Sequence, residues 1–326
     1  MLVDRFERPF SDLRVSLNEA CNLSCSYCHL EGGAMTKGDL TAEEFERIGR
    51  LAARCGAKYV KITGGEPTLH PEVVDIVRRL APHFEAVSMT TNGTTLRRLA
   101  GLLREAGLAR VNVSLDTVDA AAFRALTGGG EVDKVRDGIG AAIEAGLHPV
   151  KVNMVVLKGV NDDRITEMEG FCAEVGAALQ LIELHTDRGN AFGVPFRGSF
   201  HSLADTERAL AERAERVEIA PQHHRRRYFV PHQVEVVRPF GNSDFCSACH
   251  RIRLTADGKL KPCLMRTDNH VDIIGPMRNG ATDEELLELF VQVNDLREPY
   301  WPDPVEGEAA RRAVDRPEGL PRLRVL

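Results

Sequence analysis

Short apolar runs of strand type alternate with segments of helical spacing over the first two hundred residues. The strand-type runs occupy residues 12–17, 59–63, 85–91, 109–115, 150–157 and 179–184. Between them apolar residues recur with the helical period, and Glu44 follows Thr41 at the spacing of a capping box. Six strand-then-helix units in series predict a parallel sheet with helices outside it. Such a sheet curls into a partial or full β/α barrel, and a six-stranded open doubly wound sheet is the alternative that periodicity does not exclude.

The alternation ends after Glu183. Residues 202–217 predict a helix, residues 225–240 predict two strands joined at Pro231 and His232, and a last helix is expected near 283–296. The final stretch is rich in proline and charge, which is typical of a loosely docked tail. We therefore divide the chain into a partial barrel at 1–200, a C-terminal extension at 201–302 and a flexible tail at 303–326.

At 326 residues and 43% hydrophobic composition, the chain is long enough to bury a full core. Its 48 acidic and 42 basic residues give a net charge of −6, which offers no global attraction to nucleic acid. The basic run 225–227 is short, and we interpret it as a solvated face of a strand. No apolar run approaches the roughly 18 residues of a membrane span, and residues 1–10 lack the apolar stretch of a signal peptide. These features predict a cytoplasmic globular protein that binds neither nucleic acid nor membrane.

Eight cysteines in a reducing compartment are not expected to form a disulfide framework. Two of them, Cys55 and Cys172, lie in helical segments, and we interpret them as small buried hydrophobes. The other six form two groups, C-x3-C-x2-C at Cys21, Cys25 and Cys28 and C-x2-C-x13-C at Cys246, Cys249 and Cys263. Thiolates are soft ligands that suit zinc or iron-sulfur clusters.

Each cysteine group offers three ligands, whereas a structural zinc site closes with four. Zinc would need His29 beside the first group and His250 or His270 beside the second. An iron-sulfur cubane held by three cysteines instead leaves one iron with an open coordination position, where a cofactor or substrate can bind. The first group therefore indicates metal chemistry at the end of the first strand. For the second group, an iron-sulfur cluster and a zinc ion are both compatible with the sequence.

The first cysteine group resembles the signature of the radical S-adenosylmethionine (SAM) superfamily, in which an aromatic residue, here Tyr27, precedes the last cysteine. "TGGEP" at residues 63–67 resembles the glycine-rich element whose backbone receives the amino group of SAM, and "TTNG", "SLDT" and "KVNMVVLKGVND" are similar to later strand-end motifs. The resemblance implies a partial (βα)6 TIM-like barrel with a radical-generating [4Fe-4S] cluster on Cys21, Cys25 and Cys28. It also implies that SAM contacts Tyr27, Gly64, Gly65, Glu66, Thr91, Ser114 and Asn153.

Over about residues 3–302, the chain resembles the GTP 3',8-cyclases of molybdenum-cofactor biosynthesis, especially archaeal-type members. The second cysteine group with "RIR" inside it, "DRFERPFSDLRVSL", "VEVVRP" and "LTADGKLKPCLMR" carry this resemblance. It implies a lyase that cleaves SAM to methionine and a 5'-deoxyadenosyl radical and converts GTP to (8S)-3',8-cyclo-7,8-dihydroguanosine 5'-triphosphate. A second [4Fe-4S] cluster on Cys246, Cys249 and Cys263 would bind the purine base. The substrate-binding residues implied are Arg14, Lys61, Lys151, Arg251 and Arg253.

The resemblance also implies an electron donor such as flavodoxin or ferredoxin, and it allows a homodimer. Three departures bear on the substrate. Tyr59 and His70 replace basic residues of the family, the chain lacks a terminal Gly-Gly, and His250 stands where a hydroxyl residue is usual. A paralogue acting on another purine nucleoside or nucleotide is therefore the alternative, and a non-catalytic zinc-stabilised binding module is a distant one.

Overall fold

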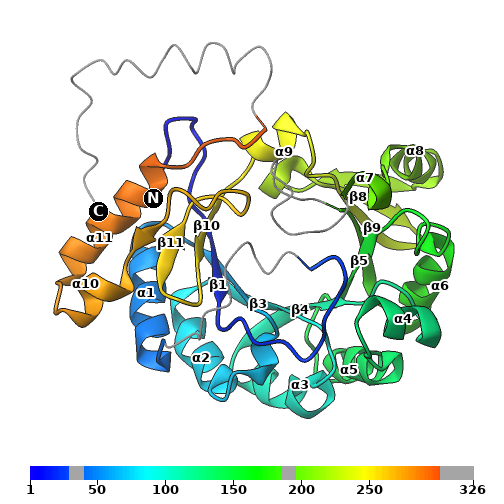
Figure 1. Cartoon of the computed structure of the whole chain (residues 1–326), viewed down its shortest axis with the longest axis horizontal. Coiled ribbons are helices and arrows are strands. Elements are labelled where there is room, and N and C mark those ends of the chain that lie inside the picture. The colour runs from blue at the N-terminus through cyan, green and yellow to red at the C-terminus, as the bar shows by residue number, and fades with distance from the viewer. Residues whose placement is uncertain (29–39, 185–195, 302–326) are drawn as a thin grey trace.

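The computed structural model describes residues 1–28, 40–184 and 196–301, which form one curved sheet with helices around its outer face (Figure 1). The first six strands are β1 (Asp12–Ser16), β2 (Tyr59–Thr63), β3 (Ala86–Thr91), β4 (Leu108–Ser114), β5 (Lys151–Val156) and β6 (Ala178–Glu183). They pair in chain order, and every pair is parallel. The predicted partial β/α barrel is confirmed. The doubly wound alternative is wrong, because the strand order does not reverse within these six strands.

Helices connect consecutive strands of the barrel. They are α1 (Ala42–Arg54), α2 (Val73–Leu80), α3 (Leu96–Glu105), α4 (Ala120–Leu126), α5 (Val132–Glu144) and α6 (Ile165–Val175), with short 3-10 turns at η2 (Pro67–Leu69) and η3 (Ala81–His83). The predicted capping box begins α1. The Thr41 hydroxyl accepts from the backbone N–H of Glu44, and the Glu44 carboxylate accepts from the backbone N–H of Thr41. Two N–H groups that the helix would leave unpaired are thereby satisfied.

The C-terminal extension adds strands to both edges of the barrel sheet. They are β7 (Arg216–Ile219), β8 (Arg226–Val230), β9 (His232–Val237), β10 (Arg251–Leu254), β11 (Lys259–Lys261) and β12 (Val271–Asp272). β9 pairs parallel with β6, and β10 pairs parallel with β1. The pairs β7–β8, β8–β9, β10–β11 and β11–β12 are antiparallel. In the described part of the chain, eight parallel strands therefore stand side by side in the order β10-β1-β2-β3-β4-β5-β6-β9.

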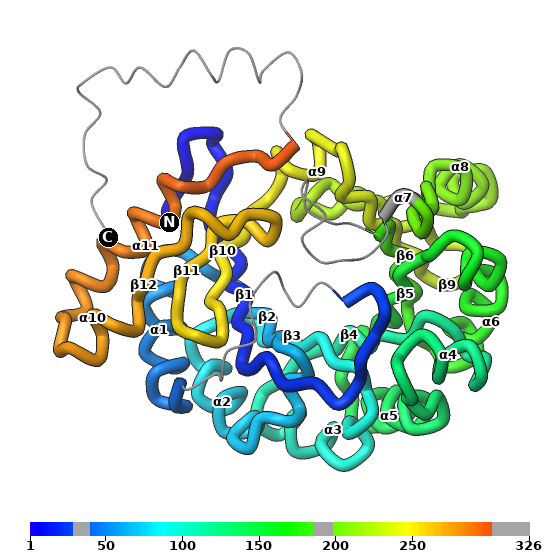
Figure 2. Tube along the Cα trace, in the orientation of Figure 1, coloured from blue at the N-terminus to red at the C-terminus, as the bar shows by residue number. Residues whose placement is uncertain are grey.

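The remaining helices include the two expected after Glu183, but the one predicted at 202–217 is shorter, because residues 216 and 217 belong to β7. They are α7 (Phe196–Ser199), α8 (Ala204–Arg213), α9 (Ser243–Ser247), α10 (Ile274–Arg278) and α11 (Asp283–Asp295), and a 3-10 turn, η4 (Gln222–His224), precedes β8. The two strands joined at Pro231 and His232 are β8 and β9. Figure 2 shows the segment that contains α9 leading from β9 to β10, the two outermost of the eight parallel strands. The predicted tail at 303–326 lies outside the described residues.

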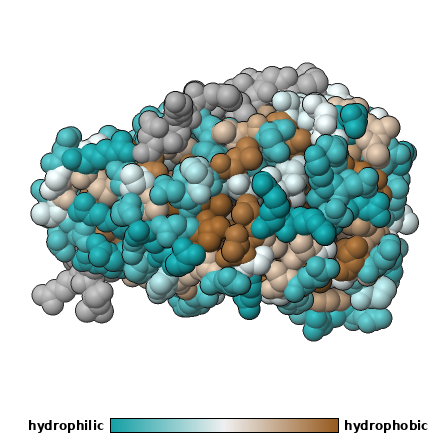
Figure 3. Space-filling view, turned by 90° about the horizontal axis from the view of Figure 1, so that it is seen from below, coloured by the Kyte–Doolittle hydropathy of each residue, from teal (hydrophilic) through white to brown (hydrophobic). Residues whose placement is uncertain are grey.

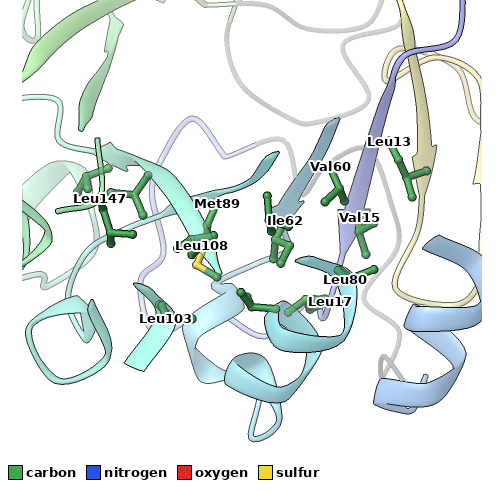
Figure 4. Packing of buried hydrophobic residues seen from close by; sticks show 14 of the residues in the cluster. Leu13, Val15, Leu17, Val60, Ile62, Leu80, Met89, Leu103, Leu108 and Leu147 are labelled. Atoms are coloured by element: carbon green, nitrogen blue, oxygen red, sulfur yellow. The ribbon is translucent and has the colours of Figure 1, made fainter. Parts of the chain in front are cut away.

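The main hydrophobic core lies between the sheet and its outer helices. Leu13 and Val15 of β1 are buried in it, and Arg14 between them points to the opposite, inner face of the sheet. Figure 4 shows Ile62 of β2 and Leu80 of α2 within this packing. Because the apolar positions take the outer face, the alternate positions of each strand carry polar and charged side chains into the barrel.

Figure 3 shows one side of the molecule, where hydrophilic side chains cover most of the surface and apolar ones gather near the centre. The exposed large apolar side chains include Leu102 of α3 and Ile143 of α5. Exposed apolar residues of this kind are ordinary on a protein surface. Within the residues described, no helix is long and apolar enough to cross a membrane.

Candidate active site

The two cysteine groups lie at opposite ends of the parallel strands. The first cysteine group, within residues 21–28, follows the C-terminal end of β1. In the second cysteine group, Cys246 and Cys249 precede the N-terminal end of β10, which is parallel to β1. Cys263 follows β11, which is antiparallel to β10, and so returns to the same end. The inner face of the barrel therefore lies between the two groups.

The glycine-rich element at the end of β2 holds the start of the first cysteine loop. The backbone N–H of Gly65 donates to the Asn18 carbonyl oxygen at 2.8 Å. A Cβ atom on Gly65 would lie 2.4 Å from the Ala20 carbonyl oxygen, and one on Gly64 would lie 2.8 Å from the Asn18 carbonyl oxygen. A side chain at either position would therefore push the loop away. The two glycines bring the backbone directly before Cys21 against β2.

Within the first cysteine group, the Cys25 thiol is affected by the other two. Burial, with the negative charges of Asp116, Cys28 and Cys21 adding to it, raises the pKa of Cys25 to about 12. A bound cluster reverses this effect, because coordination deprotonates a thiol. Among the described residues, no three Cys, His, Asp or Glu side chains surround a single metal ion position. Three soft ligands on one loop fit a cubane, in which each cysteine binds a different iron. His29, which a zinc site would need, lies outside the described residues.

Tyr27 fastens the first cysteine loop to the barrel wall. Its hydroxyl donates to Asp116 Oδ2, and Asp116 Oδ1 accepts from the backbone N–H of Val155 at 2.8 Å. Burial raises the pKa of Asp116 to about 6, although both hydrogen bonds lower it. The loop, the end of β4 and strand β5 are thus joined through one buried carboxyl group. Sequence analysis did not single out Asp116, because its role depends on contacts between distant segments.

Glu66 is fully buried, and its carboxylate is hydrogen-bonded within the protein. It accepts from Thr91 Oγ1 at 2.7 Å and from the backbone N–H groups of Asn92 at 2.6 Å and Thr68 at 3.0 Å. Burial raises the pKa of Glu66, and these hydrogen bonds lower it. Asn92 Nδ2 in turn donates to Cys21 Sγ at 3.8 Å. Glu66 therefore joins the ends of β2 and β3 next to the cysteine loop, and its contact with SAM stays a prediction.

The five predicted substrate cations meet on the inner face of the sheet. They are Arg14, Lys61, Lys151, Arg251 and Arg253, and we call the region that they line the basic chamber. Arg14 stands in register with Lys61 on one side and with Arg253 on the other. Burial lowers the pKa of Lys61 well below its usual value, and the neighbouring cations lower it further. Crowding of like charges in a buried region favours a bound anion.

The C-terminal extension adds two more arginines and a carboxylate to the basic chamber. Lys151 Nζ contacts Glu235 Oε2, and Arg225 Nη1 lies 2.9 Å from Glu235 Oε1. Arg227 Nε lies 4.0 Å from Glu235 Oε2. Burial raises the pKa of Glu235, but Arg225 and Lys151 outweigh burial and bring it to about 2. The prediction that 225–227 is a solvated face is wrong for Arg225, which is mostly buried. Strand alternation was the signal that could have found the inward arginines.

Polar side chains continue from the basic chamber across the inner face. Lys61 Nζ donates to Asn112 Oδ1 at 2.9 Å, and Asn112 Nδ2 donates to Asn153 Oδ1 at 3.0 Å. Ser114 and Gln180 stand in register with Asn153, one on each side. Two residues predicted to contact SAM, Ser114 and Asn153, thus lie on neighbouring strands.

Buried arginines brace the second cysteine group. Arg297 donates to the carbonyl oxygen of Cys249, and Arg8 Nη1 donates to the carbonyl oxygen of Cys246 at 3.0 Å. Asp4 Oδ2 pairs with both guanidinium groups, at 2.8 Å to Arg8 and 3.5 Å to Arg297. All three charged side chains are almost fully buried. The two ends of the described chain therefore fix the backbone that carries two of these cysteines.

Two thiols of the second cysteine group, those of Cys246 and Cys263, have raised pKa values. Burial raises the pKa of Cys246 to about 11, although the backbone N–H of Trp301 donates to its sulfur. The charges of Cys249 and Cys263 raise the pKa of Cys246 further. Burial also raises the pKa of Cys263, and the charge of Cys249 adds to the effect. This donor set is again three soft ligands, as in the first group.

The two residues of the first departure, Tyr59 and His70, lie against groups other than the chamber cations. Tyr59 begins β2, and its hydroxyl hydrogen-bonds Glu85. His70 follows η2 and packs edge-on against Phe45, with 6.3 Å between ring centroids. The positive charge of the basic chamber therefore comes from other positions.

Known proteins match this chain over most of its length. Residues 15–172 match the model of the Radical SAM superfamily, and residues 177–302 match that of Molybdenum Cofactor Synthesis C. A probable GTP 3',8-cyclase of Pyrococcus horikoshii is 49% identical over 306 residues, which cover 92% of this chain and 98% of the relative. A probable GTP 3',8-cyclase of Archaeoglobus fulgidus is 43% identical over 310 residues, covering 92% and 99%. The chain belongs to the GTP 3',8-cyclase family.

Solved structures show the fold of this GTP 3',8-cyclase family member at low sequence identity. SAM-bound SuiB of Streptococcus suis superimposes with a TM-score of 0.62 at 19% identity, covering 93% of this chain and 68% of SuiB. The protein anSMEcpe with bound AdoMet and a peptide gives a TM-score of 0.59 at 17% identity, covering 86% and 80%. The shared architecture is the radical SAM barrel. The residues matched by the first family model end, and those matched by the second begin, just before β6. The sheet nevertheless continues from β5 through β6 into β9, so both matched regions contribute strands to it.

Proposed function

We propose that this chain is a radical SAM lyase that converts GTP to (8S)-3',8-cyclo-7,8-dihydroguanosine 5'-triphosphate in molybdopterin biosynthesis. The observation that supports it best is the basic chamber, which lies between two cysteine groups at opposite ends of one barrel. A nucleoside triphosphate in this chamber has its phosphates among cations and its ribose and base near the two groups. The names of the archaeal relatives support the same substrate.

The first cysteine group is assigned to the cluster that binds SAM. With SAM at its open iron, a [4Fe-4S] cluster supplies the one-electron cleavage that yields methionine and a 5'-deoxyadenosyl radical. The residues assigned to SAM are Tyr27, Gly64, Gly65, Glu66, Thr91, Ser114 and Asn153. Gly64 and Gly65 press β2 against the loop, and Tyr27 ties that loop to Asp116. These contacts anchor the loop that carries the three thiols to the barrel.

The second cysteine group is assigned to a second [4Fe-4S] cluster, which binds the purine base. Its support is the three-thiol donor set, braced by Arg8 and Arg297 and placed beside the start of β10. The residues assigned to the substrate are Arg14, Lys61, Lys151, Arg251 and Arg253. They neutralise the triphosphate and fix the ribose relative to the first group, and the enclosing barrel keeps water from the reacting carbon.

Reduction of the first cluster needs one electron, for which we propose a donor such as flavodoxin or ferredoxin. We also propose a reducing, cytoplasmic location, as the sequence predicts. Assembly as a homodimer is also proposed from the resemblance, and light scattering of the purified protein tests it.

Two other functions remain as outcomes of the same test. Tyr59 and His70 motivate a paralogue that acts on another purine nucleoside or nucleotide. The distant alternative is a zinc-stabilised binding module without catalysis. In that case His250 or His270 would be the fourth zinc ligand, beside the three cysteines of the second group. Anaerobically purified protein of the first two kinds is brown, whereas a zinc protein is colourless.

An anaerobic assay with SAM, a reductant and a panel of GTP, ATP, GMP and guanosine, read by mass spectrometry, tests the proposal. We expect 5'-deoxyadenosine with every productive substrate and the cyclised product only with GTP. A cyclised or otherwise modified product from another nucleotide, with none from GTP, would establish the paralogue. Absence of 5'-deoxyadenosine from iron-loaded protein would reject the radical mechanism.

A further inference from the structure

The C-terminal extension contributes basic residues that no sequence motif assigned. Arg225 and Arg227 face Glu235, whereas Arg226 between them lies 3.6 Å from Glu207. The side chains of Arg225 and Arg227 are 19% and 34% exposed, and that of Arg226 is 56% exposed. This alternation follows the two-residue period of an extended chain. Two of the three consecutive arginines are therefore turned into the barrel.

Glu235 balances only part of the charge around it. Lys151, Arg225 and Arg227 carry three positive charges against its single negative charge. Burial lowers the pKa of Arg225, and the charges of Arg251 and Arg227 lower it further, although Glu235 raises it. These four side chains thus carry an excess of two positive charges in a largely buried place, with Asp12 also acting on Arg225 and the half-exposed Glu218 standing in register with Arg227.

Two buried donors and one buried acceptor in the same layer have no hydrogen-bond partner within the described ranges. The donors are Arg227 Nε and Gln180 Nε2, and the acceptor is Glu235 Oε1, which has Arg225 Nη1 as an ion-pair partner at 2.9 Å. Gln180, Glu235 and Arg227 stand in register across β6, β9 and β8, so the two donors and the excess charge lie together. A buried donor without an acceptor is unfavourable, and a ligand with several anionic oxygens would satisfy both donors and the charge.

We propose that Arg225 and Arg227 bind phosphate groups of the nucleotide, with Gln180 as a third donor. They come from the edge of the sheet opposite to Arg251 and Arg253, so the C-terminal extension holds the polyphosphate from both edges. Only the identity of the nucleoside in this inference rests on the proposed function. The phosphate chemistry stands on the charges and donors of the chamber itself.

Isothermal titration of tripolyphosphate and of GTP against the anaerobic, iron-loaded full-length protein tests this subsite. Arg225→Gln and Arg227→Gln each weaken both ligands at least about tenfold, or about 1.4 kcal/mol. Arg226→Gln is the matched control, because it removes the same charge from the outward face, and it leaves both affinities within about twofold. Arg225→Lys and Arg227→Lys keep the charge without the planar fork, so they give intermediate affinities. Thermal unfolding of each variant verifies that it is folded.

Unchanged affinity for tripolyphosphate in folded Arg225 and Arg227 variants, whether Gln or Lys, overturns the proposal. An equal loss in the Arg226 variant also overturns it, because the effect would then come from net charge alone. Tripolyphosphate binding that depends on Arg225 and Arg227, in a protein that forms no cyclised product from GTP, supports the subsite and rejects GTP as the substrate. Failure of the proposed phosphate subsite and failure of GTP as the substrate are therefore distinguishable.

Discussion

Lys151 and Glu235 form an ion pair inside the barrel, although 84 residues separate them along the chain. Lys151 belongs to the region that matches the Radical SAM superfamily, and Glu235 to the region that matches Molybdenum Cofactor Synthesis C. They meet because β6 pairs parallel with both β5 and β9. The basic chamber is therefore built by both regions and is complete in neither alone.

Glu235→Gln is expected to lower the free energy of unfolding by about 3 kcal/mol at neutral pH, because it leaves buried cations without their counter-charge. Urea unfolding followed by circular dichroism measures this change. Glu131→Gln is the matched control, since Glu131 is an exposed carboxylate paired with Lys134, and it should cost less than about 1 kcal/mol. Equal costs for the two variants would show that the buried ion pairs do not stabilise the fold.

Glu235 also makes stability depend on pH. Its pKa falls from the usual 4.5 to about 2, with burial opposing the shift and Arg225 and Lys151 producing it. The ionised carboxylate therefore stabilises the folded state above pH 4.5, and this stability is lost as the pH falls from 4.5 through about 2. The difference in unfolding free energy between wild type and Glu235→Gln should shrink over that range. A difference that stays constant down to pH 2 would contradict the depressed pKa.

The barrel could be predicted from the sequence because its signals are local. Alternation within a run such as "DLRVSL" places Leu13 and Val15 on one face and Arg14 on the other, and the structure follows it. Lys61, at the middle of a similar run, is likewise inside the barrel. The spacing of Thr41 and Glu44 predicted the start of α1 for the same reason.

The rest of the site depends on which distant segments meet. Arg225 is in a basic run that is typical of a solvated face, and only the pairing of β9 with β6 turns it toward the barrel. Asp116 acquires its role from contacts with Tyr27 and Val155 on two other segments. Glu66 has a bracing role among Thr91 and Asn92 that no local pattern encodes, and its contact with SAM stays a prediction.

The two cysteine groups are expected to have separate roles, the first in SAM cleavage and the second in product formation. Replacing all three cysteines of the first group with alanine should leave about four of about eight irons and abolish SAM cleavage. The same replacement in the second group should also leave about four irons, but it should spare slow SAM cleavage while product formation stops. Iron analysis and quantification of 5'-deoxyadenosine measure both outcomes. Full iron content in either triple variant would reject the assignment of that group.

Arg297→Met is expected to loosen the backbone of the second cysteine group, because Arg297 donates to the Cys249 carbonyl oxygen and pairs with Asp4. The loss should be about 2 kcal/mol of stability, the size of a buried hydrogen bond to a charged group. Iron content should fall toward that of the second triple variant, with SAM cleavage retained. Arg208→Met, on the exposed face of α8, is the control and should change neither quantity. Equal loss of iron from both groups would indicate global unfolding instead.

Arg251 and Arg253 should be the strongest single contributors from β10 to nucleotide binding. Both side chains fall on one face of the strand, and both raise the positive potential around the buried His223, whose pKa burial and these cations lower. Arg251→Ala and Arg253→Ala should each weaken GTP at least about tenfold, or about 1.4 kcal/mol, with both clusters loaded. Guanosine, which lacks phosphates, should lose less than about threefold. Lys259→Ala is the matched control, because this cation on β11 is half exposed and paired with Asp257. Equal weakening of GTP and guanosine binding would mean that the two arginines act on the base. If the wild-type protein binds GTP and guanosine with equal affinity, the proposal that the basic chamber binds the triphosphate is wrong.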